Sequence, residues 1–175
     1  RREGETDSKL KSKLKAVSFC LLFSSAAFCQ IEKKKITVKR INTPIKIDGI
    51  PDEAAWKDAQ VADKFIALRP TPFVEESLEN ASQTYFLYDN DGIYIGGYFH
   101  EKNKDSIAAE LVGRDGFGAN DFVGVIFDTY NDKLNGFEYF VTPLGEQFDA
   151  KQAPSMNGNG EDFSWNAVWQ SAAKI

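Results

Sequence analysis

Apolar and polar residues alternate along several short segments of this chain, a pattern typical of half-buried β-strands. Aromatic and β-branched residues, which favour strands, concentrate in the same segments. The pattern predicts strands over residues 36–41, 45–49, 65–68, 84–88, 93–99, 122–127, 137–141 and 147–150, and the start of another at 165–170. Helical periodicity is almost absent. The chain is therefore predicted to form an all-β fold, an antiparallel sandwich of short strands.

The clearest predicted element is a hairpin of residues 84–88 and 93–99. Residues 89–92, Asp-Asn-Asp-Gly, favour a tight turn in which Gly92 supplies a positive φ. Two glycines at 96–97 predict either a bulge or a close backbone approach. The run 122–127 is apolar almost throughout, which predicts a strand in the middle of the sandwich.

The remaining segments are less regular. Residues 52–58 follow Pro51 and carry acids in the first turn, so they predict one short helix, with Trp56 directed into the core. Residues 106–112 fit either a short helix or a strand. The stretch 153–160 is rich in Gly, Asn, Pro and Ser and predicts a loop.

The first 29 residues are typical of an N-terminal extension followed by a secretory signal peptide. Four lysines between positions 9 and 15 precede an apolar stretch too short to anchor in a bilayer, and Ala27 and Cys29 are the small residues of a cleavage site before Gln30. Acylation of Cys29, as in a lipoprotein, is a less favoured alternative because Phe28 is not small. The sequence thus predicts an exported protein that is periplasmic, outer-membrane-associated or extracellular, with residues 30–175 as its domain.

The charge of the chain excludes one class of partner, and the positions of its cysteines exclude disulfides in the exported domain. The 175 residues include 21 Lys and Arg against 26 Asp and Glu, a net charge of −5. An acidic chain lacks the clustered basic surface that nucleic acids require, so no nucleic-acid partner is expected. Both cysteines, Cys20 and Cys29, precede the predicted cleavage site. The exported domain would therefore have no disulfide and would depend on packing.

Six short motifs, in the same order, resemble the family 9 carbohydrate-binding modules. The first is Ile-Asp-Gly-Ile-Pro-Asp-Glu-Ala-Ala-Trp at 47–56. The others lie at 88–96, 114–115 with 120–122, 127–130, 140–145 with Asp149, and 165–169. The resemblance implies an immunoglobulin-like β-sandwich that binds neutral oligo- or polysaccharides without catalysis and supports polysaccharide breakdown or uptake. Modules of this family continue with further strands, so the sandwich is expected to be incomplete at its C-terminal end.

Sugar sites stack an aromatic side chain on the apolar face of a pyranose, with amides and charged groups nearby for the hydroxyls. Trp165 and Trp169 are four residues apart and lie on one face of a predicted strand. That face could be core or ligand platform, and both interpretations stay open. Arg114 and Asn120 complete the candidate sugar-binding set; for Arg114 an ion pair is the alternative.

Calcium is the one cofactor that the sequence suggests. Asp128, Asp132 and Asp121 lie in loops beside strands, where carboxylate oxygens could converge on a hard cation. Asp89 and Asp91 form a weaker candidate pair, because turn formation alone explains them.

Nothing in the sequence indicates a catalytic centre. The single histidine, His100, has no Ser or Cys partner in a recognisable motif, and abundant acids do not by themselves indicate glycoside hydrolysis. Two alternatives to sugar binding stay open. The domain could be a structural or docking periplasmic part of an outer-membrane β-barrel protein, or an accessory part of a glycoside hydrolase acting on O-glycosyl bonds.

Overall fold

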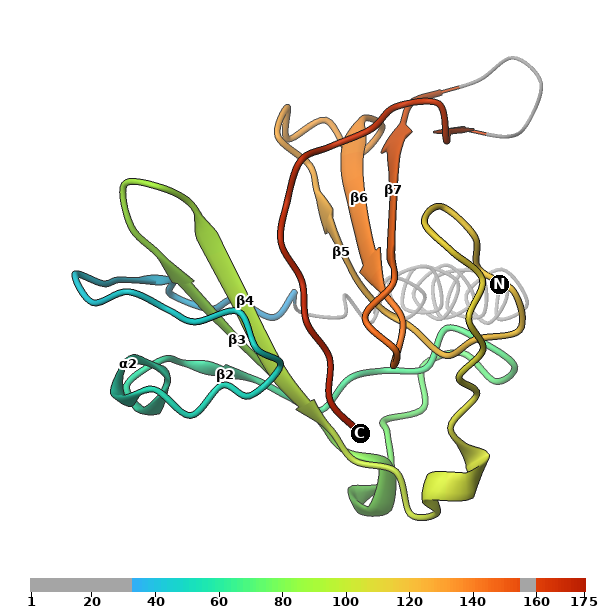
Figure 1. The fold of residues 1–175 in the computed structure, drawn as a ribbon, viewed down its shortest axis with the longest axis horizontal. Helices are drawn as coiled ribbons and strands as arrows, with labels where there is room; N and C mark the ends of the chain where they lie inside the picture. Colours follow the sequence, from blue (N-terminus) through green and yellow to red (C-terminus); the bar gives the residue numbers. More distant parts are fainter. Residues whose placement is uncertain (1–32, 155–159) are drawn as a thin grey trace, which may run out of the picture. The chain divides into compact units, whose positions relative to one another are not determined.

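The computed structural model describes residues 33–154 and 160–175 (Figure 1). The chain divides into two compact units, residues 1–35 and 36–175, and the fold described below belongs to the second. The predicted signal peptide and part of the predicted 153–160 loop lie outside the described residues. Within the described part, no helix is long and apolar enough to cross a membrane.

The second unit is mostly β, with two sheets and very little helix, as predicted. Its strands are β1 (Lys39–Arg40), β2 (Val61–Ala62), β3 (Ser82–Tyr88), β4 (Ile93–Phe99), β5 (Val123–Phe127), β6 (Gly136–Val141), β7 (Gln147–Gln152) and β8 (Glu161–Asp162). Helix α2 (Ala54–Lys57) confirms the predicted short helix, and two 3₁₀ turns cover Leu78–Asn80 and Lys104–Ser106. The sandwich type stays a prediction.

The first sheet is built around β3. Strand β4 pairs antiparallel along one edge of β3, from Tyr88 opposite Ile93 to Ser82 opposite Phe99. The other edge of β3 pairs with β1 in parallel and with β2 in antiparallel orientation. The β3–β4 register runs without interruption, so the two glycines of β4 do not mark a bulge.

The second sheet is an antiparallel meander in the order β5-β6-β7-β8. Strand β5 therefore lies at the edge of the sheet as described, and its predicted central position is wrong. Its side chains alternate between half-buried and exposed, with Ile126 directed outward. The apolar run is continuous in sequence because both faces of this strand carry apolar side chains. Alternation of apolar and polar residues therefore could not show which face is buried.

Two predicted strands are extended segments without a backbone ladder. In residues 45–49 the amide of Lys46 donates to Glu53 Oε1 (2.9 Å), and just beyond them the Ile50 amide donates to Asp48 Oδ1 (3.0 Å). Acidic side chains of the motif 47–56 thus replace the neighbouring strand as acceptors. In residues 65–68 the pairing is reduced to an isolated bridge between Ile66 and Glu75.

Trp56 lies in the core of the first sheet, as predicted. It is 6% exposed and clusters with Ile41 and Leu87. Its Nε1 donates to Glu53 Oε2 at 2.7 Å, which satisfies the polar end of the ring. A Cβ at Gly96 would lie 3.1 Å from the indole, so this glycine of β4 permits the close approach that the sequence suggested.

A second glycine brings the C-terminal segment against the same motif. Gly49 has φ +83°, and a Cβ there would lie 2.9 Å from the backbone of Ala173. Both the left-handed conformation and the lack of space require glycine at this position. The loop 47–50 and the last residues of the described chain are therefore in direct contact.

Glycine-to-alanine substitutions separate these two requirements. We expect Gly49→Ala to lower the free energy of unfolding by about 2 kcal/mol or more, because it adds a steric conflict to the cost of a left-handed alanine. Gly113→Ala, at φ +80° in open space, should cost only about 1 kcal/mol, and Gly92→Ala should be neutral or slightly stabilising. Chemical denaturation measures all three; equal losses for Gly49→Ala and Gly113→Ala would contradict the contact with Ala173.

Candidate functional site

The carboxylate of Asp149, on β7, is completely buried and joins two of the predicted site residues. Its Oδ2 accepts hydrogen bonds from Arg114 Nη2 and from Trp169 Nε1 (3.1 Å). Its Oδ1 accepts from the backbone amide of Ala167 at 2.9 Å. A buried carboxylate is tolerated only with a paired charge and satisfied lone pairs, and this one has both.

The guanidinium of Arg114 makes several contacts around this carboxylate. Besides Asp149 it donates to Gln147 Oε1, to Asn166 Oδ1 (2.8 Å) and to the carbonyl of Ala167 (3.0 Å). Asp115 adds a looser ion pair at 3.6 Å. The structure thus shows Arg114 in ion pairs with Asp149 and Asp115, and its contact with a sugar stays a prediction.

Trp165 and Trp169 lie on one face of their segment, as their spacing predicted. Both rings contact Tyr139 of β6 nearly edge-on, at centroid distances of 5.9 and 5.4 Å, and Trp165 also lies 5.0 Å from Phe137. Burial and the Asp149 carboxylate raise the pKa of Tyr139. Both tryptophans are half-buried against the second sheet, so packing accounts for their placement.

The same segment shows why residues 165–170 form no strand. Its backbone is held by side chains: Ala167 by Asp149, and the carbonyl of Trp169 by Gln147 Nε2 (3.1 Å). We call this set the Asp149 latch, comprising Arg114, Gln147, Asp149, Ala167 and Trp169.

Asn120 is not part of the latch. Its Oδ1 accepts from the Glu110 amide, and its Nδ2 donates to the carbonyls of Glu110 and Phe117 at 3.0 Å. These bonds close the loop that leads into β5. The structure thus gives Asn120 a bracing role in that loop.

The three candidate metal ligands also bind backbone amides. Asp128 accepts from the amides of Asp132 and Lys133, and Asp132 accepts from Leu134 and Asn135. The bonds from Asn135 lower the pKa of Asp132. Asp121 accepts from Ala108. Across residues 33–154 and 160–175, no three His, Cys, Asp or Glu side chains gather in a way that could hold a metal ion.

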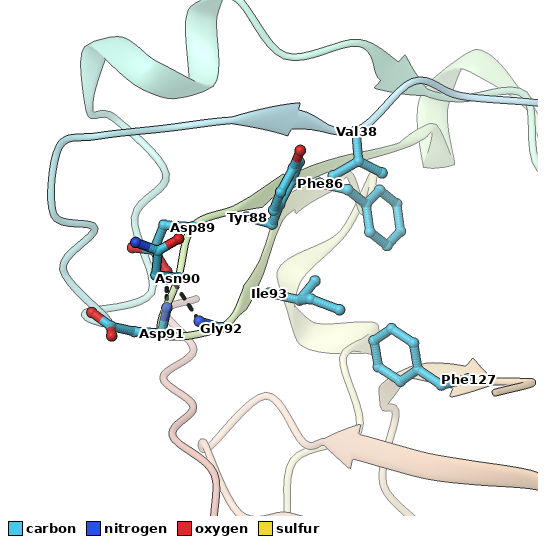
Figure 2. A pocket seen from close by; sticks show the side chains of 9 residues that line it. All are labelled: Val38, Phe86, Tyr88, Asp89, Asn90, Asp91, Gly92, Ile93 and Phe127. Atoms are coloured by element: carbon cyan, nitrogen blue, oxygen red, sulfur yellow. Dashed lines mark hydrogen bonds between the residues drawn. The ribbon is translucent and has the colours of Figure 1, made fainter.

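An open groove of about 450 Å³ lies beside the β3–β4 turn (Figure 2). The first sheet supplies Phe86, Tyr88 and Ile93 to its wall, and β5 of the second sheet supplies Phe127. Figure 2 shows these apolar side chains on one side and residues 89–92 of the turn on the other.

The turn itself is closed by a side chain. Asp89 Oδ1 accepts from the amides of Asp91 (2.8 Å) and Gly92 (3.0 Å), and these bonds lower the pKa of Asp89. Gly92 does not have a positive φ, so that part of the turn prediction is wrong. Asn90 Oδ1 accepts from Arg40 Nη2 at 2.6 Å. Asp91 also lines the groove, but Figure 2 shows its carboxylate directed away from the apolar side chains.

The sequence analysis did not predict a buried acid on β6. Glu138 is 3% exposed, and no hydrogen bond to its carboxyl group occurs among the described residues. Burial raises the pKa of Glu138, and the charge of Glu161 raises it further. The only signal in the sequence was one acid within the aromatic run 137–140.

Comparisons of the chain with protein-family models, curated proteins and solved structures found no match.

The Asp149 latch predicts a large stability loss for a small chemical change. Asp149→Asn keeps the side-chain shape but leaves Arg114 without its buried counter-charge, so we expect the free energy of unfolding to fall by about 3 kcal/mol or more. Asp115→Asn removes the looser, partly exposed partner and should cost less than about 1 kcal/mol. Chemical denaturation compares the two; similar losses would contradict the latch.

Proposed function

We propose that residues 36–175 belong to an exported, non-catalytic carbohydrate-binding module of the family 9 type, with an immunoglobulin-like β-sandwich fold. Such a module would support the breakdown or uptake of polysaccharides. The family assignment rests on the six motifs, and the binding chemistry rests on the groove.

The motifs support the family assignment because they meet in space. Residues 47–56 contact β4 through Trp56 and the C-terminal segment through Gly49. Arg114 reaches both the Asp149 motif and the motif at 165–169.

The groove beside the β3–β4 turn carries the functional proposal. It combines aromatic and aliphatic walls with the polar turn 89–92 at one edge, and a pyranose likewise has an apolar face and polar hydroxyls. Tyr88 is 39% exposed and offers part of its ring to a ligand. Both sheets line this groove, which also supports a sandwich arrangement.

Glycan binding by the full chain tests this function. We expect a panel of neutral oligosaccharides, measured by calorimetry, to include at least one that binds. Tyr88→Ala should weaken its binding about tenfold or more, a loss of about 1.4 kcal/mol, because the stacking surface is removed.

Tyr130→Ala is the matched control, since Tyr130 is 68% exposed and does not line the groove. Its affinity should equal that of the unsubstituted chain. Absence of binding to every neutral glycan in a broad panel would refute the proposal, and equal losses for the two variants would exclude this groove.

A docking role within a larger protein is the second candidate. One observation favours it: the hairpin-like loop between Phe65 and Leu78 exposes several large apolar side chains, with Leu68 79% and Leu78 95% exposed. Apolar surface of this kind is typical of protein interaction sites. Loss of self-association or partner binding in a Leu68→Ser/Leu78→Ser variant would favour docking over sugar binding.

A further inference from the structure

Glu138 lies on a sheet face that carries a cluster of phenylalanines. The β-register places it opposite Ile126 on β5 and Ala150 on β7, so the three side chains lie on the same face of the sheet. Phe140, Phe148, Phe117, Phe122 and Phe163 contact one another on this face at centroid distances of 3.8–5.6 Å. Glu138 thus shares its face of the sheet with apolar and aromatic side chains.

The carboxyl group of Glu138 lacks the partners that a buried acid requires. No described residue donates a hydrogen bond to it, and no basic side chain offsets the charge of Glu161 beside it. No fully enclosed side-chain oxygen of the described residues is without a hydrogen-bond partner. The Glu138 oxygens, which have no such partner, therefore retain some contact with solvent.

Other side chains of this face are apolar and accessible. Phe122, Ile126 and Phe163 are about half exposed, whereas Glu138 is buried. Two acids without a cation create a negative potential, and aromatic faces attract cations as well. An organic ammonium group would supply both the missing donor and the missing charge.

We propose that the Glu138 face, made of Glu138, Glu161 and the five phenylalanines, binds the ammonium group of an amino sugar. The sugar part of this inference rests on the proposed carbohydrate-binding function. The ammonium pairs with Glu138 and relieves its repulsion by Glu161, while the pyranose lies on the exposed phenylalanine rims. Neutral sugars bind without this contact, so the face determines a preference for glucosamine-type over N-acetylated residues.

Calorimetry with two matched ligands tests the inference on the full chain. Oligomers of glucosamine and of N-acetylglucosamine, equal in length, differ in charge at each sugar. In a buffer in which the amine is protonated, we expect the glucosamine oligomer to bind about tenfold tighter or more. Added salt should reduce the difference, because part of the attraction is electrostatic.

Three variants locate the effect. Glu138→Gln should remove the preference while leaving the N-acetylated oligomer unaffected; it is expected to fold, because an amide replaces a poorly solvated acid of similar shape. Glu161→Gln should reduce the preference less. Glu101→Gln, an exposed acid at the end of β4, should retain it.

Equal affinity for the two oligomers, or a preference that survives Glu138→Gln, would overturn the inference. In both cases binding of the neutral oligomer would leave the proposed function standing. Failure of both oligomers to bind would overturn this inference alone, because the proposed function is refuted only when no neutral glycan of a broad panel binds.

Discussion

The hydrogen bonds of the buried Asp149 carboxylate fix the path of the C-terminal segment in the second unit. The carboxylate holds a guanidinium from the loop before β5, an indole and a backbone amide from the C-terminal segment. That segment has no strand partner, so side-chain acceptors replace a β-ladder in fixing its path. Because its far end contacts Gly49, the latch also constrains the loop that precedes Trp56. In Figure 1 the C-terminal segment follows this path from β7 and β8 past the β3–β4 sheet.

The residues that the sequence singled out for chemistry mostly form this framework. Arg114 donates to four oxygen acceptors, Asn120 closes a loop, and Asp128 and Asp132 bind the amides of a turn. Acids of the motifs are also part of the framework: Glu53 accepts a hydrogen bond from the indole N–H of Trp56. The ligand sites that we propose are instead the groove beside the β3–β4 turn and the phenylalanine face around Glu138.

Local pattern predicted the elements whose pairing is local. The β3–β4 hairpin and helix α2 were predictable, because alternation and turn chemistry act over a few residues. The edge position of β5 and the lack of a ladder at 165–170 were not, since both depend on distant partners. The apolar run of β5 is equally consistent with either position.

The candidate site also has features that local spacing predicts and features that depend on distant residues. The shared face of Trp165 and Trp169 followed from their even spacing, but the acceptor for Trp169 comes from β7. Glu138 could not be recognised as buried from its neighbours in sequence, because its surroundings are assembled from β5, β7 and β8.

Amide hydrogen exchange at Ala167 tests the latch most directly. Its amide donates to the buried Asp149, whereas the adjacent amides of Asn166 and Val168 donate no hydrogen bond within the described residues. We expect Ala167 to exchange about a hundredfold more slowly than these two neighbours, although it lies in no strand. Exchange of all three amides at the same rate would contradict the account, because the C-terminal segment would then not be held by Asp149.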